Sequence, residues 1–248
     1  MQISKRPLAK CTGLFAIAAF AGLASHALAD FTEGFESTMP GWEVKNASSP
    51  SSANTWATTN GAAEEVFGAH SGSRYAFADD THTANHGTIS SWLFFPVDVI
   101  KNGDTIRFWT RAKSESNFPD RLQLFLSSSG NSTDTGASDL TTGVFTKLLA
   151  EVNPTLAVGG FPDQDWQLFT LTIAGLNAPV NGRFGFRYFV TDGGSLGTNS
   201  DYIGLDDVRF RSTVPAPGAL MTMLSAGALA TRRRRSPTSQ TSIDGRSK

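Results

Sequence analysis

The chain has 248 residues, of which 40% are hydrophobic, one cysteine and a formal net charge of −1. The single cysteine excludes an internal disulfide, and the near-neutral total hides a strongly acidic body. Residues 30–213 carry 12 Lys and Arg against 21 Asp and Glu, a net charge of −9, which argues against nucleic acid as a partner because phosphates demand a positive surface.

The N-terminal residues match an export signal. Basic residues precede an apolar run over residues 11–24, and Ala27-Leu28-Ala29 gives the small-x-small cleavage pattern before Asp30. The apolar run is shorter than the roughly 18 residues of a membrane span. We therefore expect residues 1–29 to be a signal peptide removed after Ala29, with an uncleaved N-terminal anchor as the alternative. Since Cys11 lies in this signal, the exported body would have no thiol.

The C-terminal residues combine two prolines, an apolar segment and a basic block. Pro215 and Pro217 precede the uncharged residues 219–230, and a cluster of four arginines follows, namely Arg232, Arg233, Arg234 and Arg235. An apolar segment followed by a basic block is a stop-transfer pattern. The segment is short for a permanent span, which favours transient membrane contact and processing over a lasting anchor.

This tail resembles the PEP-CTERM family of bacterial sorting signals, which combine a Pro-x-Pro motif, an apolar helix and a basic cluster. The resemblance implies that residues 214–235 are a sorting signal, and that a membrane enzyme of exosortase type processes it near Pro215 and Pro217. Two features depart from the family pattern: Ala216 stands where the family usually has Glu, and the polar tail 236–248 follows the arginines. An ordinary C-terminal anchor or a disordered basic tail is the alternative.

The body between the two signals shows strand patterns and no sustained helical periodicity. Short alternating runs are separated by Gly, Ser, Asn and Pro. The pattern predicts eight strands, at 30–35, 74–78, 89–97, 105–113, 121–127, 166–173, 182–191 and 202–210. We expect one all-β domain over residues 30–213, an antiparallel two-sheet sandwich of jelly-roll type, with a single closed sheet as the alternative.

The last expected strand contains two adjacent carboxylates, Asp206 and Asp207. Successive side chains of a strand point to opposite faces, so both can face water only if a bulge intervenes. An unpaired buried carboxylate is strongly disfavoured, whereas a bound Ca²⁺ accepts clustered oxygen ligands. The pattern therefore suggests a structural metal site. The alternative is that Asp206 faces solvent while Asp207 pairs with Arg74, Arg187 or Arg209.

The opening Phe31-Thr32-Glu33-Gly34-Phe35-Glu36 and the closing Gly204-Leu205-Asp206-Asp207-Val208-Arg209-Phe210 look like the choice-of-anchor J domain. That group is similar to the cleaved-adhesin and MAM-like jelly rolls of bacterial and animal surfaces. The resemblance implies that the first and last strands lie near each other and enclose a calcium ion. Its ligands would be Glu36 with one or both of Asp206 and Asp207, and Asp79 or Asp80 would complete the set.

Two other patterns are open to a functional interpretation. His82 and His86 in the segment 79–86 suggest a transition metal, but the Thr, Asn and Gly around them favour an exposed polar loop. The five tryptophans (Trp42, Trp56, Trp92, Trp109 and Trp166) suggest a sugar platform, yet ordinary packing is the stronger expectation.

No Gly-x-Ser-x-Gly nucleophile motif is present, so we expect no catalytic activity. The function predicted is that of an exported, surface-sorted protein with a calcium-stabilised adhesin-like domain, acting in adhesion or in an extracellular matrix. Its partner would be an extracellular glycan or a surface protein. A carbohydrate-binding module is the alternative, and a secreted hydrolase has no supporting residues.

Overall fold

The computed structural model describes residues 30–59, 66–95 and 99–213. The expected signal peptide with Ala27 and Ala29, the sorting signal with Pro215, Pro217 and Arg232–Arg235, and the tail 236–248 all lie outside the described residues. Within the described ranges, no helix is long and apolar enough to cross a membrane.

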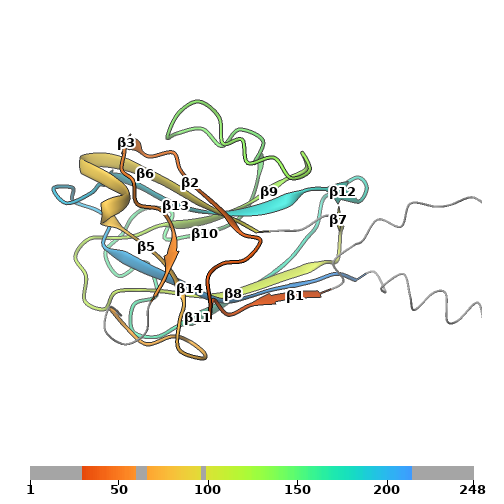
Figure 1. The fold of residues 1–248 in the computed structure, drawn as a ribbon, viewed down its shortest axis with the longest axis horizontal. Helices are drawn as coiled ribbons and strands as arrows, with labels where there is room; N and C mark the ends of the chain where they lie inside the picture. The colour runs from red at the N-terminus through yellow and green to blue at the C-terminus, as the bar shows by residue number, and fades with distance from the viewer. Residues whose placement is uncertain (1–29, 60–65, 96–98, 214–248) are drawn as a thin grey trace, which may run out of the picture.

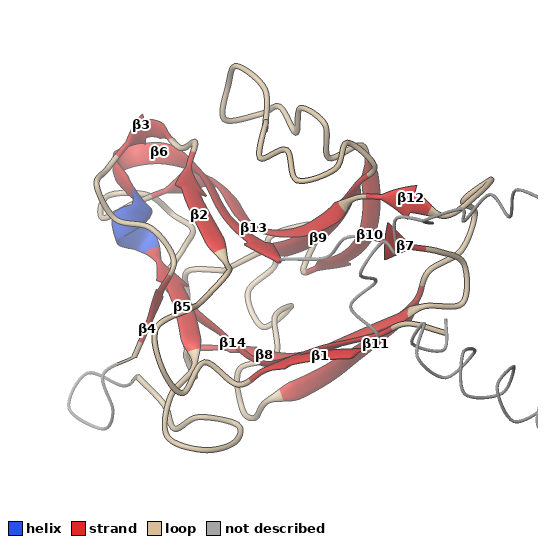
Figure 2. Ribbon diagram, turned by 45° about the vertical axis from the view of Figure 1, so that its right-hand side comes forward, coloured by secondary structure: helices blue, strands red, loops and turns tan. Residues whose placement is uncertain are grey.

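The described residues form a sandwich of two antiparallel sheets that face each other (Figures 1 and 2). The first sheet has the strand order β11-β8-β14-β5-β4, with β1 paired to β14 beside β5. Its strands are β1 (Asp30–Glu33), β4 (Ala57–Thr58), β5 (Ala76–Asp79), β8 (Thr105–Ala112), β11 (Gln167–Thr172) and β14 (Tyr202–Arg211).

The second sheet has the order β10-β9-β13-β6-β2, with β3 paired to β6. Its strands are β2 (Glu43–Asn46), β3 (Ser49–Ser51), β6 (Thr83–Phe95), β9 (Leu122–Ser127), β10 (Lys147–Val152) and β13 (Arg183–Gly193). Two short strands, β7 (Val99–Ile100) and β12 (Val180–Asn181), pair with each other as a separate two-stranded antiparallel sheet. A 3₁₀ turn, η1 (Asp80–His82), connects β5 to β6 along the chain.

Strand β8 shows how the alternating pattern builds the core. Ile106, Phe108 and Ala112 are buried between the sheets, whereas Arg107 is exposed and Trp109 is half-buried on the opposite face. This alternation is what a strand with one face on the core requires. The main core joins inward-facing side chains of both sheets, including Phe108 of β8 and Phe186 of β13, whose rings meet edge to face at 5.0 Å.

Both sheets also carry a smaller apolar cluster on their outer face. On the first sheet, Tyr75, Trp166 and Tyr202 are buried together with Phe67 and Trp109 against them. On the second sheet the cluster consists of Trp92, Phe94, Phe125 and Phe145. Loops therefore cover part of each outer face, and the loop over the first sheet carries the residues of the candidate site.

All eight predicted strands are present, and the all-β sandwich of jelly-roll type is confirmed. The pairing of β1 with β14, in register at Phe31 and Phe210, places the first and last strands side by side as the resemblance implied. Several short strands were not predicted, because segments of two to four residues such as β4 and β7 carry too little periodicity. The longest addition is β10, whose exposed and half-buried residues alternate weakly.

Candidate functional site

A β-bulge in β14 brings two adjacent carboxylates to one face of the first sheet. Asp206 is paired with Trp109 of β8, and the next pair is Arg209 with Arg107, so two residues of β14 oppose the single Phe108. Asp207 takes the positive φ of 45° that this bulge requires, a conformation that Asp tolerates better than most residues. A bulge, which the sequence left open as one way to reconcile the two carboxylates with a strand, is therefore present.

The Asp206 carboxylate anchors the loop that crosses the outer face. The side chain is fully buried, and its Oδ2 accepts hydrogen bonds from the backbone N–H groups of His70 at 3.0 Å and of Ser71 at 3.2 Å. Its Oδ1 accepts from the backbone N–H of Asp207 at 2.7 Å. One carboxylate thus satisfies three backbone donors of the loop and the bulge.

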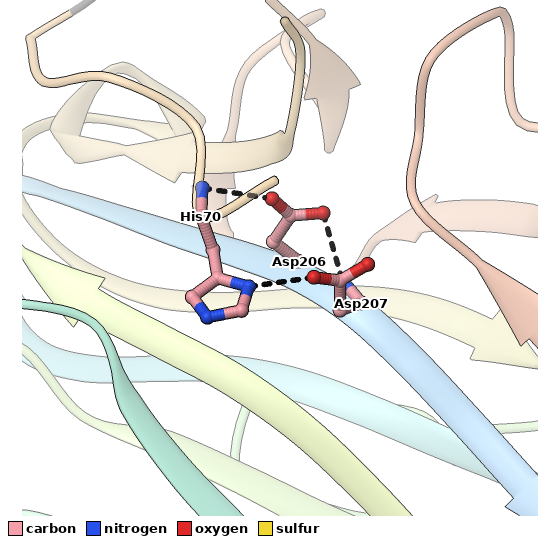
Figure 3. A group of neighbouring side chains, drawn as sticks. All are labelled: His70, Asp206 and Asp207. Atoms are coloured by element: carbon pink, nitrogen blue, oxygen red, sulfur yellow. Dashed lines mark hydrogen bonds and ion pairs between the residues drawn. The ribbon is translucent and has the colours of Figure 1, made fainter. Parts of the chain in front are cut away.

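The Asp207 carboxylate binds the side chains of the same loop. Its Oδ2 lies 2.6 Å from Nδ1 of His70, and its Oδ1 accepts from the Ser71 hydroxyl at 3.0 Å. Figure 3 shows His70 beside the two carboxylates, with its backbone nitrogen joined to Asp206 and its ring nitrogen joined to Asp207. The imidazole also stacks on Trp109, with ring centroids 3.8 Å apart and an interplanar angle of 19°, which fixes the ring over the bulge.

Burial favours the protonated form of Asp206. Desolvation raises the pKa of Asp206 to about 7, with a further contribution from the charge of Asp207. The hydrogen bonds from the backbone of Asp207, Ser71 and His70 act in the opposite direction, toward a lower pKa. No described Lys or Arg forms an ion pair with Asp206 or Asp207. A buried carboxylate without a basic partner beyond an imidazole is a position at which a cation lowers the free energy.

The three arginines that the sequence offered as partners of Asp207 have other contacts in the structure. Arg187 is buried on the second sheet, beside Trp92 and Phe189. Arg209 forms no ion pair with a described carboxylate, and Arg74 acts through its charge on Glu36. The partner of Asp207 is instead His70, which the sequence patterns did not single out.

Glu36 holds the far end of the same loop. Its carboxylate accepts hydrogen bonds from the backbone N–H groups of Ser73 and Arg74 at 3.0 and 3.1 Å, and from the Ser73 hydroxyl at 2.9 Å. Although desolvation raises its pKa, the hydrogen bonds from Ser73 and Arg74 outweigh that effect and lower the pKa below the usual value. Gly72 approaches so closely that an added Cβ would lie 2.2 Å from Oε1 of Glu36.

The ligand-bearing atoms of His70, Asp206 and Asp207 lie within 4.8 Å of one another, and this is the one such acidic or histidine group among the described residues. Glu36 lies outside it, so the structure brings two of the expected metal ligands together and attaches the third to a neighbouring part of the loop. Asp206 and Asp207 supply oxygens that suit a hard cation such as Ca²⁺, whereas His70 supplies a nitrogen that Ca²⁺ does not prefer.

Asp79 is placed apart from the bulge and does not join this group. It precedes η1, and its Oδ1 accepts from the N–H of Thr81 at 3.0 Å as a helix cap. Asp80 begins the 3₁₀ turn, and its pKa is raised by burial and then by the charges of Asp79 and Asp201. Neither carboxylate completes a set with Asp206 and Asp207.

The segment 79–86 is not the exposed polar loop expected from its composition. It contains the end of β5, the turn η1 and the start of β6, and His82 is buried with its pKa lowered to about 4 by desolvation. His86 is exposed and lies 2.8 Å from Asp192. The two histidines therefore have different environments, one buried and the other exposed beside Asp192.

The tryptophans serve packing. Trp42, Trp56, Trp92 and Trp166 are at most 8% exposed, and Trp109 is half-buried under His70. Of the five tryptophans, only Trp109 is more than 8% exposed, and the His70 imidazole stacks on its ring.

Next to the bulge, the outer face of the first sheet is hollowed into a pocket of about 200 Å³, which we call the arginine pocket. It is lined by Thr32, Arg107, Trp109, Leu168, Asp207 and Arg209. A larger, more open cleft of about 670 Å³ follows Glu151–Asn153, Gly159–Gln167 and Phe169.

No family model matches the chain, and no curated protein matches it either. Among solved structures, the fold is similar to the K1 cleaved adhesin domain of Lys-gingipain from Porphyromonas gingivalis, with 20% identity, a TM-score of 0.51, and coverage of 75% of this chain and 99% of that one. The K2 domain of Lys-gingipain has 17% identity and a TM-score of 0.51 over 74% of this chain and all of that domain.

The K3 domain from the same organism has 20% identity and a TM-score of 0.50, over 73% of this chain and 98% of that one. These similarities define the class by fold: the chain contains a β-sandwich of the kind found in cleaved adhesin domains. At these identities they carry the fold alone.

Proposed function

We propose that the chain is an exported, non-catalytic recognition protein whose adhesin-like sandwich is stabilised by Ca²⁺ and acts in adhesion or matrix association. The observation that carries this proposal is the pair of carboxylates at the bulge. Asp206 is buried and Asp207 lies beside it, and the one basic side chain among the described residues that bonds to either carboxylate is the His70 imidazole. In an exported protein, Ca²⁺ is the abundant cation that such an oxygen cluster selects.

Asp206 and Asp207 would hold the ion, which supplies charge neutralisation and no reaction chemistry. Their link to His70 and Ser71 means that occupancy would fasten the outer loop to the last strand. Extracellular calcium modules often bind at about 10⁻⁴–10⁻³ M. At a hundredfold excess over the dissociation constant, the ion would stabilise the fold by about 2.7 kcal/mol.

Glu36 has a different role in this proposal from the one its motif implied. Because Glu36 lies outside the group formed by His70, Asp206 and Asp207 and its carboxylate binds Ser73 and Arg74, we assign it to holding the loop over the bulge rather than to coordinating the ion. Asp79 is assigned to capping η1. The calcium site is therefore smaller than expected, and loop carbonyls and water would complete its oxygen shell.

The choice-of-anchor J and PEP-CTERM assignments belong to the same proposal. Their support is the order of motifs from Phe31 to Phe210 and the Pro-x-Pro, apolar and arginine pattern after residue 213. On this basis an exosortase-like enzyme processes the tail after transient membrane contact, and the sandwich is delivered to the cell surface or matrix.

Isothermal titration of the purified protein with CaCl₂ tests the metal part of this function. We expect one site in the wild type and none in Asp207→Asn, since Asn keeps the positive φ while removing the charge. Titration with MgCl₂ should give much weaker binding, because Mg²⁺ requires a tighter octahedral shell. Equal calcium binding by wild type and variant would show that the bulge is not the site.

A further inference from the structure

Two arginines occupy directly opposite positions on the outer face of the first sheet. Arg209 of β14 is paired with Arg107 of β8. Thr32 of β1 is the other neighbour of Arg209, and Thr170 of β11 is the other neighbour of Arg107. Like charges directly opposite each other destabilise a sheet, so this row carries an unfavourable pair flanked only by hydroxyls.

The described residues do not neutralise this pair. No carboxylate oxygen of the described part of the chain lies within ion-pair distance of either guanidinium. Nε of Arg209 is buried and has no hydrogen-bond partner. Asp207, the one acid in the arginine pocket, directs its two oxygens to His70 and Ser71 instead.

This is unusual in a body with a net charge of −9 over residues 30–213, where acids are plentiful. The other arginine of β14, the exposed Arg211, does have a nearby acid, with Nε 3.9 Å from the Asp30 carboxylate. The larger cleft differs, because several of its polar groups are bonded within the protein. There Glu151 accepts from Gln123 and Asn153 bonds Asp120 and Ala157.

We propose that the arginine pocket binds the carboxylate of a uronic acid residue in an acidic polysaccharide. Guanidinium groups match planar carboxylates with paired N–H donors, and two forks side by side supply such donors. Leu168 and the half-buried Trp109 give the pocket an apolar wall, and Thr32 adds a hydroxyl. This combination suits a sugar ring, which has both C–H and O–H surfaces.

The size of the pocket limits the ligand. At about 200 Å³ it is smaller than the roughly 300–1,000 Å³ of pockets for drug-sized ligands, and it therefore takes one sugar residue of a longer chain. The acidic body repels polyanions at long range, so specificity would come from the two forks rather than from general attraction. The inference rests on the proposed recognition function and names its ligand class.

The test is calorimetric titration of the purified protein with trigalacturonate and trimannuronate, in CaCl₂ and in EGTA. Short oligomers avoid the calcium gels that long polyuronates form. We expect at least one of these uronates to bind, and Arg107→Gln and Arg209→Gln each to weaken it by about tenfold or more, as for a lost charged hydrogen bond. Arg107→Lys, which keeps the charge without the fork, should also weaken it.

Arg211→Gln is the matched control, since it removes one arginine from the same strand outside the pocket; its affinity should stay within about twofold of the wild type. Fully methyl-esterified trigalacturonate, which retains the sugar and lacks the charge, should not bind. A thermal melt of each variant checks that the protein is folded before its affinity is compared with that of the wild type.

Absence of binding to both uronates, equal binding of the methyl ester, or unchanged affinity in Arg107→Gln and Arg209→Gln would overturn the inference. Tighter binding of a glutamate-rich peptide would also overturn it, by showing that the occupant is a protein. Uronate binding without any calcium binding would refute the metal site and leave the arginine pocket intact. Calcium binding without uronate binding would refute the arginine pocket and leave the metal site intact.

Discussion

The backbone N–H of His70 donates a hydrogen bond of 3.0 Å to the carboxylate of Asp206, 136 residues further along the chain. This contact joins a loop between β4 and β5 to the last strand of the sandwich. The buried acceptor of this bond also serves Ser71 and Asp207. The outer face of the first sheet is thus organised around a single carboxylate at a bulge.

Replacement of Asp206 should release this loop. Asp206→Ala leaves three backbone donors without their acceptor, and we expect a loss of about 2–4 kcal/mol of unfolding free energy. In a domain of this size each kcal/mol lowers the melting temperature by about 2–4 °C. Hydrogen exchange at His70 and Ser71 should accelerate well beyond that of the core strands.

Asp192→Ala removes an exposed carboxylate near the end of β13, in the second sheet, and serves as the control. Protection of the His70 amide that is unchanged in Asp206→Ala would contradict the assignment of Asp206 as the anchor.

Glu36→Gln separates loop attachment from metal binding. The amide retains an acceptor for Ser73 and Arg74 but loses the charge, so we expect a loss of no more than about 1 kcal/mol. The calcium-dependent rise in melting temperature should persist, because Glu36 lies outside the group of His70, Asp206 and Asp207. If Glu36→Gln abolishes that rise, Glu36 is a calcium ligand as its motif implied.

Protonation of Asp120 should make the fold more stable in mild acid. Asp120 is buried, where desolvation raises its pKa to about 7, partly offset by hydrogen bonds from Tyr188 and Asp201. The folded state therefore binds this proton more tightly than the unfolded state, and stability falls as the pH rises from about 4 to about 7. A shift of this size corresponds to at most about 4 kcal/mol.

Urea unfolding at pH 5 and pH 8 in EGTA measures this effect. In Asp120→Asn the difference between the two pH values should shrink relative to the wild type, while the part due to Asp206 remains. An identical pH dependence of wild type and Asp120→Asn would show that Asp120 does not titrate in this range.

Much of the fold follows from local pattern, but the site does not. The alternation of Ile106, Arg107 and Phe108 predicts both the strand β8 and its buried face. The adjacent Asp206 and Asp207 conflict with period-two geometry, and a bulge or a bound cation would resolve that conflict. These inferences needed only neighbouring residues.

The partner of the carboxylates depends instead on tertiary structure. His70 lies in a segment of Gly, Ala and Ser with no periodicity, and only the folded sheet brings it over Trp109 and Asp207. Glu36 and Asp79 were matched by motif alone, and motif order does not specify which carboxylates converge. His82 was expected in a loop because its neighbours in the sequence are polar. In the fold, hydrogen bonds that the sequence does not reveal satisfy polar groups of this segment, such as the bond from the Asn46 amide to the backbone carbonyl of His82.

Export and sorting give a separate expected outcome in the native host. The mature chain should begin at Asp30, and replacement of Arg232–Arg235 by alanine should change its surface retention, because the basic block stops transfer. Mass spectrometry and cell fractionation measure both. Unchanged mass and distribution in the arginine variant would refute the sorting signal without affecting the sandwich or its metal site.

The calcium-dependent change in melting temperature is the most direct test of the central claim. Calorimetric scans of the purified protein in EGTA and in millimolar CaCl₂ should differ by several degrees, since about 2.7 kcal/mol is gained at a hundredfold excess of the ion. Asp207→Asn should melt at the same temperature in both. Wild-type protein that melts identically in EGTA and in CaCl₂ would contradict a metal-stabilised sandwich.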